Sequence, residues 1–130
     1  MESFENLIAW QSGMKLVKTV YTLTKQLPKE ECYGLSSQLR RASTSILANL
    51  AEGYARKTPP DKASRYVIAR GKCSETHALI LICTELDYFS KDETRECIDL
   101  LHTTGKLLTG LIKAHSSNPN PNPNPTHALR

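Results

Sequence analysis

The sequence predicts an all-α protein, an antiparallel up-down-up-down four-helix bundle followed by a disordered C-terminal tail. Apolar residues recur at alternating spacings of three and four along four separate segments. No segment alternates with a period of two for long enough to indicate a strand. Short connections between long helices favour antiparallel neighbours. We therefore expect residues 1–115 to form the bundle and residues 116–130, with their repeated Asn-Pro, to form a disordered tail.

The first predicted helix runs from about Phe4 to Gln26 and carries two apolar stripes. The stripes are Leu7, Trp10, Met14, Val17 and Tyr21, and Leu16, Val20, Leu23 and Leu27. A helix that is apolar on two sides touches more than one neighbour. The helix ends at Leu27-Pro28, because the residue before a proline avoids the α region.

The second predicted helix begins at Tyr33 or Leu35 and ends near Arg56. Its apolar residues fall on one face: Leu35, Leu39, Ala42, Ile46, Leu50 and Gly53. Glycine lowers helix propensity at position 53. Gly53 alternatively permits the close approach of another backbone.

The third predicted helix begins at Thr58-Pro59-Pro60-Asp61 and continues to about Leu86. Thr58 suits an N-cap and Pro59 suits the first helical position. Its apolar side consists of Ile68, Ala69, Cys73, Leu79, Ile80, Ile82, Cys83 and Leu86. These residues predict a long helix packed against the rest of the bundle.

The fourth predicted helix begins at Ser90, where Ser90 and Glu93 have the spacing of a capping box, and ends near His115. Its heptad pattern consists of Ile98, Leu101, Gly105, Leu108 and Ile112. Apolar stripes in the first and fourth helices are wider than a single core requires, which predicts a homo-oligomer.

Composition excludes several protein classes. The longest wholly apolar run, residues 78–83, is far too short to span a bilayer, and the N-terminus lacks a secretory pattern. We therefore expect a cytoplasmic protein with no membrane association.

The four cysteines are Cys32, Cys73, Cys83 and Cys97, and none has the spacing of a redox or zinc motif. They are expected to be free thiols that pack as small hydrophobic side chains.

Positive charge is concentrated in the middle of the chain. The formal net charge is +4, but residues 40–72 contain eight basic and two acidic residues. Clustered lysine and arginine bind nucleic-acid phosphates. The candidate nucleic-acid-binding residues are Arg40, Arg41, Arg56, Lys57, Arg65 and Arg70. The alternative is that these arginines form ion pairs with Glu52, Glu75 or Glu85.

Three polar residues are candidates for a structural network. Asn49 and Glu52 lie beside the apolar stripe of the second helix, and Glu75 lies beside that of the third. A buried charge needs a partner, so we expect them to fix helix or subunit register. The alternative is an active-site acid, but a lone glutamate makes a poor acid–base site. No Glu-x-x-His pair, nucleophile motif or phosphate-binding glycine loop occurs, so we expect neither metal, cofactor nor enzymatic activity.

Three blocks of the chain carry a family resemblance: FENLIAWQSGMKLVKTVYTLTKQLP, YGLSSQLRRASTSILANLAEGYARK and IARGKCSETHALILICTELDY. Together they strongly resemble the four-helix-bundle proteins encoded by intervening sequences in bacterial 23S rRNA genes. The resemblance implies an antiparallel bundle that assembles into a ring, suspected to be a homopentamer. Related proteins are accessory to the reverse transcriptase of diversity-generating retroelements, where a basic barrel contacts nucleic acid and the enzyme.

Charge and resemblance together predict a non-enzymatic, oligomeric protein that binds the backbone of RNA or DNA through a basic surface, alone or as an accessory to a partner protein. One alternative is a protein–protein scaffold that does not bind nucleic acid. A second alternative is an enzyme of unknown class, which would need a pocket where Asn49, Glu52 and Glu75 converge.

Overall fold

The structure is a computed structural model that describes residues 3–116. Its elements, in chain order, are η1 (Phe4–Asn6), α1 (Ile8–Thr24), η2 (Lys29–Glu31), α2 (Leu35–Ala55), α3 (Pro59–Glu85) and α4 (Lys91–His115). The described residues contain no strand, and the prediction of an all-α four-helix bundle is confirmed. The predicted Asn-Pro-rich tail lies outside the described residues, apart from Ser116, which ends α4.

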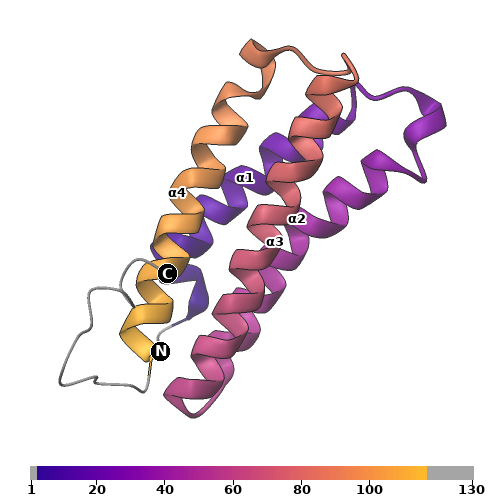
Figure 1. The fold of residues 1–130 in the computed structure, drawn as a ribbon. Coiled ribbons are helices and arrows are strands. Elements are labelled where there is room, and N and C mark those ends of the chain that lie inside the picture. Colours follow the sequence, from indigo (N-terminus) through magenta and orange to yellow (C-terminus); the bar gives the residue numbers. More distant parts are fainter. Residues whose placement is uncertain (1–2, 117–130) are drawn as a thin grey trace, which may run out of the picture.

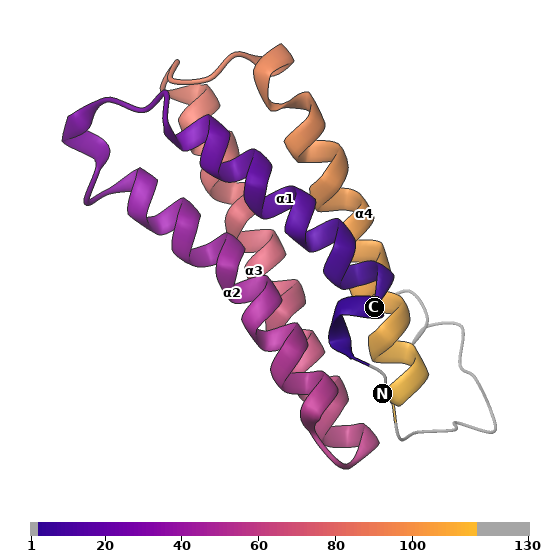
Figure 2. The same cartoon turned by 180° about the vertical axis from the view of Figure 1, so that it is seen from behind.

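The four helices form a closed ring in which each helix touches two others. Contacts join α1 to α2, α2 to α3, α3 to α4, and α4 back to α1. Figure 1 shows α3 between α2 and α4, and Figure 2, from behind, shows α1 crossing between the same two helices. Consecutive helices are therefore antiparallel neighbours, as the short connections predict.

The predicted helix starts of α3 and α4 are confirmed. The Thr58 hydroxyl accepts a hydrogen bond from the Asp61 amide, and Pro59 is the first helical residue. The Ser90 hydroxyl accepts from the Glu93 amide while the Glu93 carboxylate accepts from the Ser90 amide, which completes the capping box. Because these bonds join residues three apart, their sequence signals are local and reliable.

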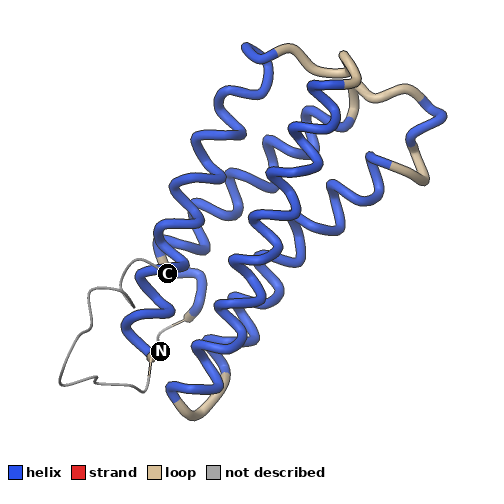
Figure 3. Tube along the Cα trace, in the orientation of Figure 1, coloured by secondary structure: helices blue, strands red, loops and turns tan. Residues whose placement is uncertain are grey.

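The start of α1 differs from the prediction of a continuous helix from Phe4. Residues Phe4–Asn6 form a 3-10 turn, Leu7 is extended, and the α-helix begins only at Ile8 (Figure 3). The Ser3 hydroxyl accepts from the Glu5 amide and so caps this separate turn. The helix also ends at Thr24, two residues before the predicted Gln26.

The core uses one of the two predicted stripes of α1 as its centre. Leu16, Val20, Leu23 and Leu27 are buried, together with the predicted α2 residues Leu39, Ala42, Ile46, Leu50 and Gly53. The other stripe of α1, including Trp10 and Met14, is only half-buried, and Tyr21 is 36% exposed. This second stripe packs at the rim of the core within one chain.

Part of the predicted apolar side of α3 is not buried. Ala69, Cys73, Leu79, Ile80 and Cys83 are buried, but Ile68, Ile82 and Leu86 are exposed by 41%, 45% and 55%. The reason is the ring arrangement, since α2 and α4 cover two sides of α3 and leave its outward side uncovered. No helix among the described residues is both long enough and apolar enough to cross a membrane.

The cysteines are free thiols, as predicted. Cys73, Cys83 and Cys97 are buried in the core as small apolar side chains. Cys32 differs, because it lies exposed in the connection between α1 and α2.

Candidate nucleic-acid interface

The turn between α2 and α3 gathers half of the predicted binding residues: Arg56, Lys57 and Arg65. The helix α2 ends at Ala55, Arg56 adopts an extended backbone, and Pro59 begins α3, so only three residues connect the helices. We call the side chains around this turn the hairpin tip: Glu52, Arg56, Lys57, Asp61, Lys62 and Arg65. Figure 1 shows that this turn forms one end of the bundle.

One carboxylate at the hairpin tip pairs with two arginines. The Arg56 guanidinium lies 2.7 Å from Oε1 of Glu52, and the Arg65 guanidinium lies 3.3 Å from the same oxygen. Glu52 therefore bridges the end of α2 to the start of α3. With Asp61 counted, the hairpin tip holds four basic and two acidic residues, so it keeps a positive excess.

The remaining lysines add to this charge. Lys57 is exposed in the connecting turn. Lys62 donates a hydrogen bond to the Tyr54 carbonyl, and its ammonium lies 5.3 Å from the centre of the Tyr54 ring. That arrangement fixes Lys62 without neutralising it, because both partners are uncharged. Lys62 was not among the predicted binding residues, although it belongs to the same basic segment.

Arg40 and Arg41 lie far from the hairpin tip. They precede Arg56 by about four helical turns, which places Arg41 about 22 Å away along α2. Arg40 donates to the Thr24 hydroxyl at 2.9 Å and lies 4.6 Å from the centre of the Tyr21 ring, so it ties α2 to α1. Arg41 is exposed.

Arg70 belongs to a third location. Its guanidinium donates to the Thr109 hydroxyl of α4 at 3.4 Å, across the groove between α3 and α4. Lys106 and the imidazoles of His77 and His102 line the same groove. The structure thus divides the six predicted residues among the hairpin tip, the opposite end of α2 and the α3–α4 groove.

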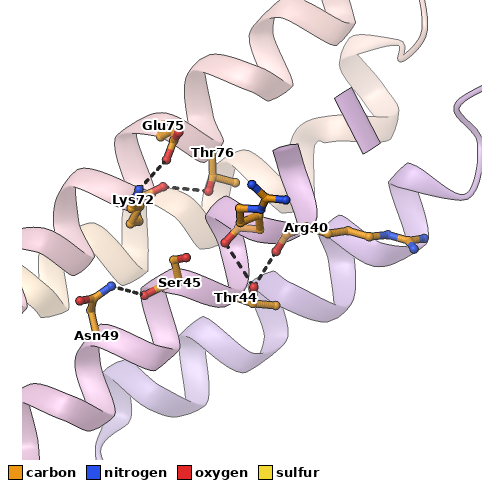
Figure 4. A network of polar contacts seen from close by, with 8 residues as sticks. Arg40, Thr44, Ser45, Asn49, Lys72, Glu75 and Thr76 are labelled. Carbon is orange, nitrogen blue, oxygen red and sulfur yellow. Dashed lines mark hydrogen bonds and ion pairs between the residues drawn. The ribbon is translucent and has the colours of Figure 1, made fainter. Parts of the chain in front are cut away.

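The three residues predicted as a polar network make separate contacts. Figure 4 shows Asn49 donating to the Ser45 carbonyl within α2 at 2.8 Å, and Lys72 pairing with Glu75 within α3 at 3.3 Å. Glu52 pairs with the arginines at the hairpin tip. Within residues 3–116 no hydrogen bond joins these three side chains to one another, and their role in subunit register stays a prediction.

The described structure does not bring Asn49, Glu52 and Glu75 together in a pocket, as a catalytic site would require. The side chains of Glu52 and Glu75 are 46% and 51% exposed, so neither is held in a desolvated site. Four surface hollows of the described chain are lined by other residues. In the same part of the chain, no three histidine, cysteine or acidic residues are grouped to hold a metal ion.

Packing beneath the hairpin tip involves residues that periodicity did not single out. Tyr66 is only 1% exposed, and burial raises the pKa of its hydroxyl. Its ring contacts the His115 imidazole edge-on, with centroids 5.6 Å apart, so the end of α4 lies beside the start of α3. The hairpin tip is thus backed by a buried aromatic ring.

Known proteins resemble this chain in sequence and in fold. The profile of the 23S rRNA-intervening sequence protein family matches residues 5–110. The fold matches the crystal structure of a protein of unknown function from the S23 ribosomal protein family of Bacteroides thetaiotaomicron VPI-5482. The TM-score is 0.75 at 22% identity, covering 82% of this chain and 99% of the other. No curated protein matches the chain.

Proposed function

The chain belongs to the 23S rRNA-intervening sequence protein family, and from that premise we propose that it is a non-enzymatic, oligomeric bundle that binds the phosphate backbone of RNA or DNA through basic side chains. In this proposal the protein acts in the bacterial cytoplasm, alone or as an accessory to a partner protein. The observation that carries the proposal is the positive excess at the hairpin tip, where Arg56 and Arg65 share one carboxylate.

The hairpin tip suits phosphate binding for two reasons. Arginine presents several N–H donors in a planar fork, so Arg56 and Arg65 retain donors for phosphate oxygens beyond those used by Glu52. Lys57 is exposed on the same turn and adds a mobile positive charge. Such a surface attracts a polyanion without reading its sequence.

The proposed interface extends along α2. Arg56 directly follows α2, and helix geometry places Arg41 within about 60° of it around the axis and about 22 Å from it along the axis. A nucleic-acid backbone that follows this face meets the hairpin tip first and Arg41 further along. We assign Arg40 a smaller contribution, because its side chain is held by Thr24 and Tyr21.

Fluorescence anisotropy with a short labelled RNA and a DNA duplex, measured over a salt series, tests this proposal. Binding should weaken steeply with salt, because each neutralised phosphate releases a counterion. The triple variant Arg56→Gln/Lys57→Gln/Arg65→Gln should bind more weakly and lower the salt slope by about two units for single-stranded RNA and nearly three for the DNA duplex.

The matched control removes the same charge elsewhere. Lys15 and Lys18 are exposed on α1 and Lys25 directly after it, and replacing all three by glutamine should leave most of the affinity intact. Absence of binding at low salt would refute the proposal. An equal loss of affinity in both triple variants would refute the assignment of the binding surface to the hairpin tip.

We also propose that the outward side of α3 is the surface through which copies of the chain assemble. Five exposed apolar side chains lie on or beside it: Val67, Ile68, Leu81, Ile82 and Leu86. They form two groups along the helix, one at Val67 and Ile68 and the other at Leu81, Ile82 and Leu86. Exposed apolar surface of this kind favours burial against another chain. The family resemblance implies five copies in a ring.

Light scattering after gel filtration tests the assembly. The protein should elute as an oligomer, and Ile68→Glu/Ile82→Glu should reduce the mass to that of one chain. The control Gln11→Glu/Gln26→Glu, at exposed positions on α1 and just after it, should leave the mass unchanged. A monomer mass for the unaltered protein would refute the proposed assembly. An intact oligomer that binds no nucleic acid would instead favour the protein–protein scaffold.

A further inference from the structure

We propose that the groove between α3 and α4 binds a nucleotide, with the phosphate against Arg70 and Lys106 and the base against His77 and His102. The groove has a volume of about 410 Å³, which is within the range of small-molecule sites. The ligand is either a free mononucleotide or a nucleotide unit of a single strand, and the two sources share this chemistry.

One end of the groove is suited to an anion. Arg70 approaches α4 by donating to the Thr109 hydroxyl, and among the described residues this is its one hydrogen-bonding partner. Lys106 lies on the facing helix, less than one turn before Thr109. No carboxylate lines the groove, so these two cations are not neutralised there. A guanidinium and an ammonium on opposite walls are a suitable pair for a phosphate.

The other end presents two aromatic rings. His77 on α3 and His102 on α4 meet edge-on, with ring centroids 5.6 Å apart. His77 follows Arg70 by seven residues, so the rings lie about 10 Å along α3 from the cationic end. Histidine rings stack on bases in proteins that bind single-stranded nucleic acid. The cationic end of the groove therefore suits the phosphate of a nucleotide, and the aromatic end suits its base.

Gly105 keeps the middle of the groove open. It lines the groove, and a Cβ added at this position would meet no atom within 4 Å. Gly71 provides the matched control, because a Cβ there also meets nothing within 4 Å, yet Gly71 does not line the groove. A Cβ at position 105 therefore meets no obstacle, so a leucine there should reduce the volume of the groove. Leucine also favours the helix over glycine.

The test is calorimetric titration of the full chain with AMP, adenosine and inorganic phosphate. AMP should bind, and adenosine and phosphate should each bind at least about tenfold more weakly, because each lacks one of the two interactions. Gly105→Leu should remove AMP binding and Gly71→Leu should not. His77→Ala/His102→Ala should weaken it, whereas the phenylalanine pair at the same positions should restore binding by retaining the stacking surface.

An oligoadenylate separates the two sources of ligand, and this part of the inference rests on the proposed nucleic-acid binding. AMP binding that Gly105→Leu removes, without oligoadenylate binding, supports the groove as a site for a free nucleotide and counts against the proposed function. Oligoadenylate binding that persists in Gly105→Leu, with no AMP binding, overturns the groove and leaves the hairpin tip as the interface. Equal affinity for AMP in Gly105→Leu and Gly71→Leu would also overturn the groove as the binding site.

Discussion

Gly53 of α2 lies directly against the ring of Tyr66 on α3. A Cβ at position 53 would be 2.7 Å from Cε1 and 2.9 Å from Cδ1 of that ring, and 3.0 Å from Cβ of Arg65. The close neighbour is thus an aromatic ring, not the backbone that the sequence alternative anticipated. The absence of a side chain at Gly53 lets α2 and α3 approach just below the hairpin tip and brings Arg65 within reach of Glu52.

Gly53→Ala should destabilise the protein in spite of alanine's higher helix propensity. Overpacking against a buried ring costs about 1–3 kcal/mol, and propensity returns only about 1 kcal/mol. Urea unfolding should therefore show a lower free energy of unfolding. Gly71→Ala is the control, since open space at that position should make it stabilising by about 0.5–1 kcal/mol. A stabilised Gly53→Ala variant would contradict the close approach.

A buried hydrogen bond joins the first and the last helix of the bundle. The hydroxyls of Ser12 on α1 and Thr104 on α4 are 2.7 Å apart, and both residues are buried. Thr104→Val should cost about 1–3 kcal/mol, because it leaves the Ser12 hydroxyl without its cross-helix partner. Adding Ser12→Ala should cost less than the sum of the single changes. Strict additivity in this double-mutant cycle would show that the bond is not formed.

Stability should fall at alkaline pH because of buried thiols. Burial raises the pKa of Cys73 and Cys97 to about 12 each, above the ordinary thiol value of 9.0. Between these values the unfolded chain loses the thiol protons and the folded chain keeps them, so the unfolding free energy decreases as pH rises through this window. Urea midpoints measured from neutral to alkaline pH should show the decrease, and Cys73→Ala/Cys97→Ala should make it shallower. An unchanged slope would argue against buried thiols.

Glu52→Gln should strengthen nucleic-acid binding. The change frees Arg56 and Arg65 from their shared carboxylate and raises the positive charge of the hairpin tip. Anisotropy should show tighter binding, with a salt slope steeper by about one unit. Glu75→Gln is a matched control, because Glu75 is also exposed and paired, but with Lys72 outside the hairpin tip. Equal effects of both variants would indicate a general response to net charge.

Local sequence signals accounted for much of the fold. The caps at Thr58 and Ser90 depend on residues within one turn, so the beginnings of α3 and α4 could be predicted. Periodicity also found both stripes of α1, but it could not decide which stripe forms the core centre. That choice depends on which side of α1 is covered by α2 and α4. The spacing of apolar residues such as Leu16 and Trp10 within α1 does not predict the positions of these neighbouring helices.

The candidate site was less predictable than the fold. The composition of residues 40–72 identified the basic segment, and helix geometry placed Arg41 and Arg56 on one face. The pairing of Arg65 with Glu52 depends on the approach of α2 to α3. The meeting of Arg70 with Thr109 depends in turn on the register between α3 and α4, for which no local signal exists.

The closed ring of helices has a consequence for the order in which the chain assembles. Three of the four contacting pairs are consecutive hairpins, and contacts between nearby segments form quickly because little loop entropy is lost. Among the described helices, α1 and α4 are the contacting pair most distant in sequence, and their Ser12–Thr104 bond spans 92 positions. We therefore expect a fast-folding protein in which the seam between α1 and α4 closes last, so that changes along it mainly accelerate unfolding.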